Sequence, residues 1–111
     1  MQRRVFEMDA QLKKGLLEIC VLRALRERES YGYKIISDLE PTIKISESTL
    51  YPILKRLEGE KAVTVRTETH NGRLRKYFKI TKLGEEKLAD FIAGMEEFQK
   101  ISDYIVKGGT K

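Results

Sequence analysis

The hydrophobic periodicity of the chain changes near residue 62 from that of a helix to that of a strand, and this change restricts the fold more than any other feature. Apolar residues within 50–57 recur at steps of three and four, as on a helix with one buried face. From Val63 onward, apolar and polar residues alternate. A second β-prone run ends at Ile80, and Asn71-Gly72 between the runs adopts positive φ angles at little cost. The sequence therefore predicts a helix followed directly by a β-hairpin.

Two further helices are predicted upstream. Residues 9–28 are apolar on nearly every face, so we expect this helix to be covered from more than one side, by its own domain and by a second subunit. Ser30 is the predicted N-cap of the next helix, and Pro41 ends it. The buried stripe of that helix is predicted to consist of Gly32, Ile35, Ile36 and Leu39.

The helix that carries residues 50–57 is predicted to begin at Ser46 or Ser48 and to end near Glu60. We favour Ser48, because Pro52 then falls within the first two turns, where the hydrogen bond that proline cannot donate matters least. The connection to the preceding helix is short, so the two form a helix-turn-helix pair.

Residues 81–106 are predicted to form one long helix. Thr81 is its N-cap, and Glu85 and Glu86 lie near the positive end of the helix dipole. A small domain offers such a helix little to pack against, so its expected partner is a second copy of the chain. The heptad seam for that contact consists of Leu88, Phe91, Met95, Phe98, Ser102 and Ile105.

Together these elements predict a mainly α fold with a small β-hairpin, in which a hairpin wing follows a helix-turn-helix. We expect residues 9–82 to form the winged helix-turn-helix domain and residues 83–107 to form a C-terminal dimerisation helix. The length of 111 residues is that of one domain.

The positive charge of the chain is concentrated in one third of it. Residues 46–82 hold nine basic and four acidic residues, whereas the remaining residues hold thirteen of each. A basic patch confined in this way favours a polyanionic partner, because each neutralised phosphate releases counterions.

Other classes of function have little support in the residue types. The most apolar run, residues 15–25, is about half as long as a bilayer requires. No membrane partner is therefore expected, and the absence of a signal segment predicts a cytoplasmic protein. Cys20 is expected to be a small buried hydrophobe, and His70 an exposed turn residue rather than a metal ligand. We expect no catalytic residues, no metal and no cofactor.

Three stretches form specific motifs in a specific order. They are Ser30-Tyr31-Gly32-Tyr33, residues 48–58 around Thr49-Leu50-Tyr51-Pro52, and residues 72–81 beginning Gly72-Arg73-Leu74-Arg75-Lys76-Tyr77, followed by Gly84. In these stretches the chain resembles the compact branch of the PadR-like family of bacterial transcription regulators, over nearly its whole length. It departs from the family at Ser48 and around Lys61-Ala62, where many members have glycine. The resemblance implies homodimeric winged-helix repressors, in which the C-terminal helix contacts the partner's N-terminal helix.

The face of the third helix opposite its core residues is free to enter a major groove. We expect Ser48, Thr49 and Tyr51 to meet base edges there, and Lys55 and Arg56 to meet phosphates. Arg73 at the wing tip is placed to reach a minor groove. The predicted DNA-binding set is Ser48, Thr49, Tyr51, Pro52, Lys55, Arg56, Asn71, Gly72, Arg73, Arg75 and Lys76. The alternatives are that Tyr51 packs against the wing, and that Lys55, Arg56, Lys76 and Lys79 are solvated surface charges.

A second predicted set lies at a dimer interface or in an effector pocket within it. It consists of Leu12, Leu16, Leu88, Phe91, Ile92, Met95, Phe98 and Gln99. Some compact members resemble one another in having a flat apolar pore at this interface that takes planar, often cationic drugs. Met95 stands where an aromatic residue is often expected. The alternative is a closed dimer core without a ligand.

The predicted function is that of a dimeric, sequence-specific DNA-binding transcriptional regulator. We expect a repressor of a pseudo-palindromic operator in double-stranded DNA, released by a small apolar or planar aromatic effector. The alternative is a winged-helix protein-interaction module without specific DNA binding, since a fold does not by itself determine a function. In that case charge reversal at Lys55, Arg73 and Arg75 leaves partner binding intact.

Overall fold

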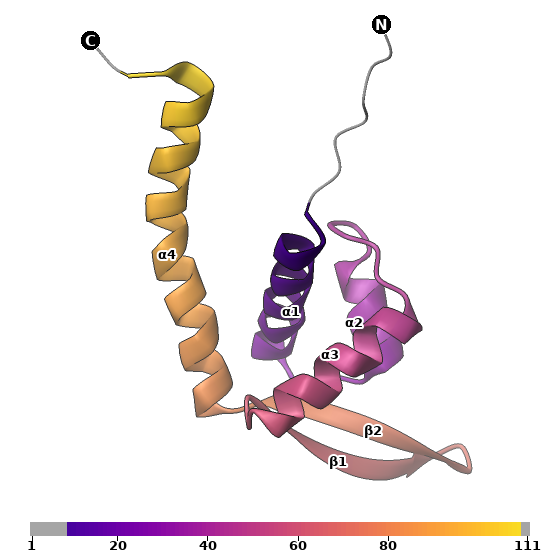
Figure 1. Cartoon of the computed structure of the whole chain (residues 1–111). Coiled ribbons are helices and arrows are strands. Elements are labelled where there is room, and N and C mark those ends of the chain that lie inside the picture. Colours follow the sequence, from indigo (N-terminus) through magenta and orange to yellow (C-terminus); the bar gives the residue numbers. More distant parts are fainter. Residues whose placement is uncertain (1–8, 110–111) are drawn as a thin grey trace, which may run out of the picture.

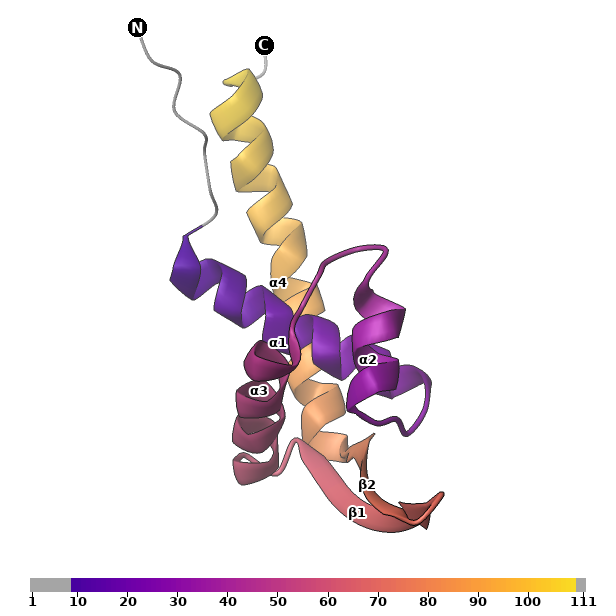
Figure 2. The same ribbon diagram turned by 90° about the vertical axis from the view of Figure 1, so that its right-hand side faces the viewer.

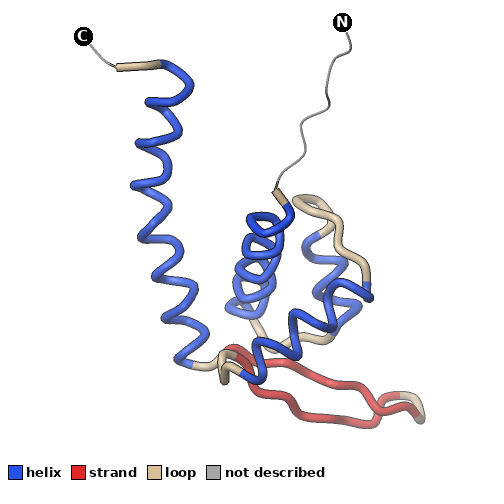
Figure 3. The backbone as a smooth tube through the Cα atoms, in the orientation of Figure 1, coloured by secondary structure: helices blue, strands red, loops and turns tan. Residues whose placement is uncertain are grey.

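The computed structural model describes residues 9–109. Its elements follow the order α1 (Ala10–Glu27), α2 (Gly32–Leu39), α3 (Glu47–Gly59), β1 (Val63–His70), β2 (Arg73–Ile80) and α4 (Lys82–Lys107). The first three helices form a bundle above the hairpin, and α4 rises beside them (Figure 1, Figure 3). The predicted mainly α fold with a hairpin and a long C-terminal helix is confirmed. None of the helices in this part of the chain is long and apolar enough to cross a membrane.

The hydrophobic core lies where α1, α2 and α3 meet. Leu22 and Leu25 of α1 and Ile35 of α2 are almost fully buried, and Phe78 closes the core from the hairpin. The four predicted core residues of α3 are also buried: Leu50, Ile53, Leu54 and Leu57. Each such side chain contributes roughly 2 kcal/mol through burial. The α2 stripe is confirmed too, with Gly32 and Ile35 buried and Ile36 and Leu39 partly buried. Cys20 is half-buried, and burial raises the pKa of its thiol.

The third helix begins earlier than predicted. Its N-cap is Ser46, whose Oγ accepts a hydrogen bond from the backbone nitrogen of Thr49 at 3.3 Å, so the start at Ser48 is wrong. A hydroxyl that satisfies a free N–H at a helix end stabilises the helix by about 1 kcal/mol. Pro52 still lies in the second turn, where its ring costs a single hydrogen bond.

Ser30 was predicted to cap α2, and this prediction is wrong. The N-cap is Tyr31, and Ser30 instead pairs with the hairpin as an isolated bridge. Its backbone nitrogen donates to the Phe78 carbonyl at 3.0 Å, and its carbonyl accepts from the Phe78 nitrogen at 2.7 Å. These two backbone hydrogen bonds hold Ser30 in the bridge, one residue before the N-cap. They join the α1–α2 connection to the outer edge of β2.

The hairpin has the predicted turn at Asn71-Gly72. β1 and β2 pair without interruption from Val63↔Ile80 to His70↔Arg73. The turn residues Asn71 and Gly72 have φ angles of 53° and 79°, so both central positions are left-handed, as a two-residue type I′ turn requires.

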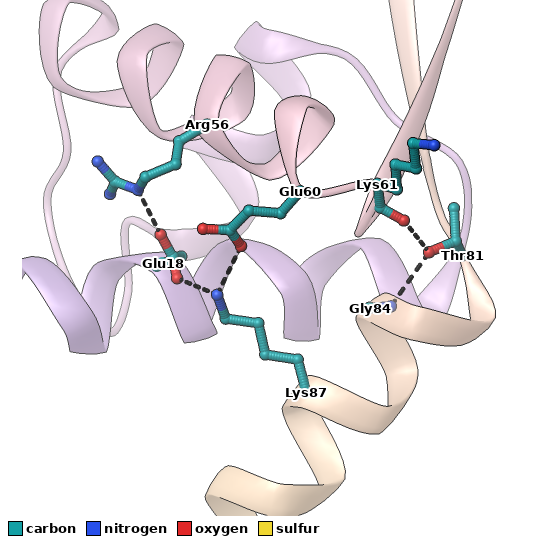
Figure 4. Close-up of polar contacts among 7 residues, drawn as sticks. All are labelled: Glu18, Arg56, Glu60, Lys61, Thr81, Gly84 and Lys87. Carbon is teal, nitrogen blue, oxygen red and sulfur yellow. Dashed lines mark hydrogen bonds and ion pairs between the residues drawn. The ribbon is translucent and has the colours of Figure 1, made fainter.

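The base of α4 is joined to the connection between α3 and β1. The Thr81 Oγ1 accepts from the Gly84 nitrogen at 3.1 Å and donates to the Lys61 carbonyl at 2.7 Å (Figure 4). Gly84 is buried against this connection, and a Cβ at its position would overlap the Ala62 carbonyl oxygen, so the close approach requires glycine. Leu88 is the last fully buried residue of α4, and the helix beyond it leaves the domain.

A carboxylate of α1 connects α3 to α4. Glu18 pairs with Arg56 at 2.8 Å and with Lys87 at 2.7 Å, and Lys87 also reaches Glu60 at 2.8 Å (Figure 4). The Glu18 side chain is only 12% exposed. Its burial raises the pKa of the carboxyl, but the hydrogen bonds from Lys87 and Arg56 outweigh this effect, so the pKa of Glu18 is lowered overall.

We expect Glu18→Gln to lower the free energy of unfolding by roughly 1–3 kcal/mol, because two cations lose a charged acceptor. Glu27→Gln is the matched control, since its pair with Arg23 is exposed, and it should change stability little. The measurement is urea unfolding at one fixed protein concentration.

The stabilisation by Glu18 depends on pH. Because the folded pKa is the lower one, the unfolded chain takes up the proton first as the pH falls. The contribution is complete above the unfolded pKa of 4.5 and is lost as the pH falls through the folded pKa. A difference between the wild type and Glu18→Gln that stayed the same at about pH 2 would contradict this account.

Candidate nucleic-acid interface

The outer face of α3 carries polar side chains because its other face supplies the core. Ser48, Pro52 and Lys55 are exposed along the middle of this face. Tyr51 lies on the flank toward the hairpin and is 45% exposed. Thr49 lies on the opposite flank, where its Oγ1 contacts the Oγ of Ser46 at 3.1 Å.

A cleft separates the start of α2 and α3 from the hairpin. Its volume is about 540 Å³. The α-helical side contributes Tyr31, Gly32, Tyr33 and Tyr51, and the hairpin contributes His70, Asn71, Arg73, Leu74, Arg75 and Lys76. The cleft therefore brings together five members of the predicted DNA-binding set, Tyr51, Asn71, Arg73, Arg75 and Lys76, which are as much as 25 positions apart in the sequence.

Gly32 sets the position of Tyr51 in this cleft. A Cβ on Gly32 would overlap the Tyr51 hydroxyl and come within 3.0 Å of the ring carbon that carries it. The phenol thus lies directly over the first turn of α2. Burial, followed by the nearby Glu47 carboxylate, raises the pKa of Tyr51, so its hydroxyl keeps its proton and remains a donor.

The hairpin is held by two aromatic side chains that lie between two cationic ones. The Arg66 guanidinium lies 4.5 Å from the Tyr77 ring centroid, and Tyr77 meets Tyr31 edge to face with centroids 5.5 Å apart. The Arg75 guanidinium lies 4.0 Å from the Tyr31 centroid. Arg66 also binds both carboxylate oxygens of Glu29 at 2.8 Å. These contacts attach the hairpin to the α1–α2 connection.

The predicted wing residues have two different environments. Asn71, Gly72, Arg73 and Lys76 are exposed at or near the tip, and Arg73 and Lys76 form no ion pair within residues 9–109. Arg75 is half-buried against Tyr31 and donates to the Tyr77 hydroxyl at 3.4 Å. His70 is exposed, and no cluster of three metal-ligating side chains occurs in the part of the chain that the structure describes.

On α3 the two predicted phosphate ligands also differ. Lys55 is exposed on the outer face. Arg56 is half-buried on the α1 side, and its Nε donates to Glu18. The Arg56 guanidinium is thus paired with α1, whereas Lys55 points away from the domain core.

Several residues of the cleft were not assigned a role from the sequence. Tyr31 supports Arg75, Tyr33 is 70% exposed on the first turn of α2, and Leu74 is 77% exposed on the wing. Tyr33 lies off the apolar stripe of α2, which is the one sequence signal that it faces outward. The aromatic partner of Tyr31 is Tyr77, 46 positions away, so no local pattern indicates this edge-to-face contact.

The predicted interface or effector residues lie on α1 and α4. Leu88 is buried and Leu16 and Phe91 are half-buried, so these three side chains already pack, fully or in part, within one protomer. The others are exposed: Leu12 by 48%, Ile92 by 46%, Met95 by 51% and Phe98 by 62%, with Gln99 also exposed and bonded to Asp103. Ile101 and Ile105 continue the apolar surface toward the end of α4.

Comparison with known proteins gives this geometry a context. The model of the transcriptional regulator PadR-like family matches residues 21–90, which is well over half of the chain. A PadR-like transcription factor from Bacteroides fragilis is 34% identical, with a TM-score of 0.78 over 86% of this chain and 95% of its own. A PadR family regulator from Eggerthella lenta is 28% identical, with a TM-score of 0.80 over 89% and 88%.

A protein from Lysinibacillus sphaericus is 30% identical over 100 residues, which are 86% of this chain and 92% of its own. Residues 21–90, which match the family model, contain α2, α3, the hairpin and the base of α4, so they include the cleft and the outer face of α3. Members of the PadR-like family are regulators rather than enzymes, and membership of the family implies DNA binding and dimerisation. The chain belongs to the PadR-like family of transcriptional regulators.

Proposed function

We propose that the protein is a dimeric, sequence-specific repressor that binds a pseudo-palindromic operator in the cytoplasm. Residues 9–82 contact the DNA in this proposal, and residues 83–107 join two copies. The observation that carries it is the arrangement of the cleft, in which exposed Arg73 and Lys76 lie beside Tyr51 on the flank of an outward-facing α3. A basic surface next to a helix that is free to enter a major groove is the arrangement of a DNA reader.

The contacts divide by chemistry. Ser48, Thr49 and Tyr51 lie in the first turns of α3 and offer hydroxyls to base edges, with Pro52 beside them. Lys55 and Lys76 neutralise phosphates, which position the domain without reading sequence. Arg73 enters the adjacent minor groove from the wing tip, with Asn71 and Gly72, and Arg75 holds the wing at the required angle.

The exposed apolar face of α4 supports dimerisation. Ile92, Met95 and Phe98 are about half or more exposed in one protomer, although such side chains are normally buried. Leu12 on α1 is a further apolar side chain that is about half exposed in one protomer. A two-fold dimer covers these surfaces and places two α3 helices about one turn of DNA apart, at 34–36 Å.

Release by a small molecule forms the last part of the proposal. Where the faces of α1 and α4 meet around the two-fold axis, apolar residues including Leu16, Phe91 and Met95 offer a lining for an apolar or planar aromatic effector, whereas Leu88 is already buried within its own protomer. Gln99 supplies one amide at its edge. An effector that fits only one spacing of the two α3 helices changes the affinity for the operator.

The first prediction concerns DNA. The protein should bind a duplex from its own promoter region at least about a thousandfold more tightly than random duplex at about 0.15 M salt. Replacing both Arg73 and Lys76 by Gln should weaken both complexes and lower the slope of log K against log salt by about 2. Fluorescence anisotropy measures both. Equal affinity for promoter and random DNA would refute sequence-specific repression and favour the interaction module.

The second prediction concerns the dimer. Met95→Asp places a charge in the proposed apolar contact and should convert the protein to monomers at micromolar concentration, as measured by sedimentation velocity. Lys100→Asp introduces the same side chain elsewhere on α4 and should leave the dimer intact. A dimeric Met95→Asp protein would show that α4 is not the interface.

The third prediction concerns the effector. Calorimetric titration with proflavine, a planar aromatic cation, should give a saturable heat with the wild type, because the ring system buries apolar surface between two copies. Leu12→Asp, on the α1 wall of the proposed pocket, should abolish this heat. Absence of heat with the wild type would remove the pocket and leave a closed dimer core.

A further inference from the structure

A second groove lies beside α3, on the side away from the wing cleft. It encloses about 560 Å³ between the N-terminal half of α1, the α2–α3 connection and the first turns of α3. Four cationic residues line it: Lys13, Lys14, Lys44 and Arg56. None of the residues that line it is acidic.

Three of these cations have no ionic partner within residues 9–109. Arg56 is paired with Glu18 at 2.8 Å, whereas Lys13, Lys14 and Lys44 are exposed and form no ion pair in that range. Like charges gathered at one groove repel one another, and an anion that enters the groove relieves this repulsion. The groove therefore favours an anionic partner.

The position of the groove indicates which anion. α3 separates it from the wing cleft: Tyr51 lines the cleft, and Thr49 and Pro52 line the groove. Ser48 and Lys55 face outward between the two. Figure 2 shows the N-terminal end of α1 on one side of α3 and the hairpin on the other.

A helix that occupies the major groove has a sugar-phosphate strand on each side of it. In the proposed complex, the cations of the wing cleft lie beside one of these two strands. We propose that Lys13, Lys14 and Lys44 contact phosphates of the strand on the other side, so that each protomer holds the major groove by both of its edges. This inference rests on the proposed DNA binding. It adds a phosphate-binding surface from α1 and the α2–α3 connection, outside the basic segment 46–82.

Phosphate contacts on both edges have a specific consequence. Contacts on one side allow the helix to tilt or shift across the groove, whereas contacts on both sides hold it in one register. Because they read no sequence, the three lysines should strengthen binding to promoter and random duplex by the same factor.

The test compares salt dependence in the full-length protein. With a fluorescein-labelled random duplex, anisotropy titrations between about 50 and 200 mM salt give the slope of log K against log salt. Replacing Lys13 and Lys14 by Gln should lower this slope by about 2, and Lys44→Gln alone should lower it by about 1. The matched control replaces Lys100 and Lys107 of α4 by Gln, which removes the same charge far from α3, and its slope should equal that of the wild type.

Two outcomes separate this inference from the proposed function. If the wild type binds DNA and the Arg73 and Lys76 variant loses slope, but the Lys13 and Lys14 variant behaves like the Lys100 and Lys107 control, the second phosphate surface is refuted and DNA binding stands. If the wild type binds no duplex at any salt concentration, both fail. Circular dichroism of each variant verifies that the helices are intact.

Discussion

The Glu18 carboxylate holds together the two parts of the molecule that a dimeric DNA reader must keep at a constant angle. It accepts hydrogen bonds from Arg56 on α3 and forms an ion pair with Lys87 on α4, from a position that is largely buried. Removing one charge from such a cluster leaves its partners uncompensated, so the three helices are coupled in energy as well as in space. Gly84 and Thr81 add a close contact and a cap at the base of α4. In the proposed dimer through α4, the angle between α4 and α3 in turn determines how far apart the two α3 helices lie.

The wing depends on a comparable arrangement at the other end of the bundle. Its two strands have a solvent-exposed face, and a lone hairpin is only marginally stable in water. The stack of Arg66, Tyr77, Tyr31 and Arg75, together with the Ser30 bridge to Phe78, attaches it to the α1–α2 connection. Arg73 and Lys76 project from this support and form no ion pair within residues 9–109, and the anchored wing limits the entropy that is lost in their proposed contact with DNA.

Prediction from the sequence succeeded where the pattern was local. The Leu50–Leu57 repeat, the Asn71-Gly72 turn and the Thr81 cap all depend on residues within a few positions of one another, and the structure has each of them. It failed at Ser30 and at the start of α3, where distant or competing hydrogen bonds decided the outcome. The role of Arg56 was open for the same reason, because its partner Glu18 lies 38 positions away. Of the predicted DNA-binding set, five residues line the wing cleft, whereas Thr49, Pro52 and Arg56 line the groove on the far flank of α3.

The amino-acid sequence by itself determined the order of the elements, the buried faces of α2 and α3, and the hairpin turn, because periodicity and backbone preferences act over short distances. It also located a basic segment between residues 46 and 82. Only the tertiary structure decided which cations share a surface. Arg56 and Arg66 of that segment are occupied by Glu18 and Glu29, whereas Lys13, Lys14 and Lys44, from parts of the chain with no net charge, line one groove beside α3. Electrostatic attraction depends on distance in space, and packing sets that distance between residues far apart along the chain.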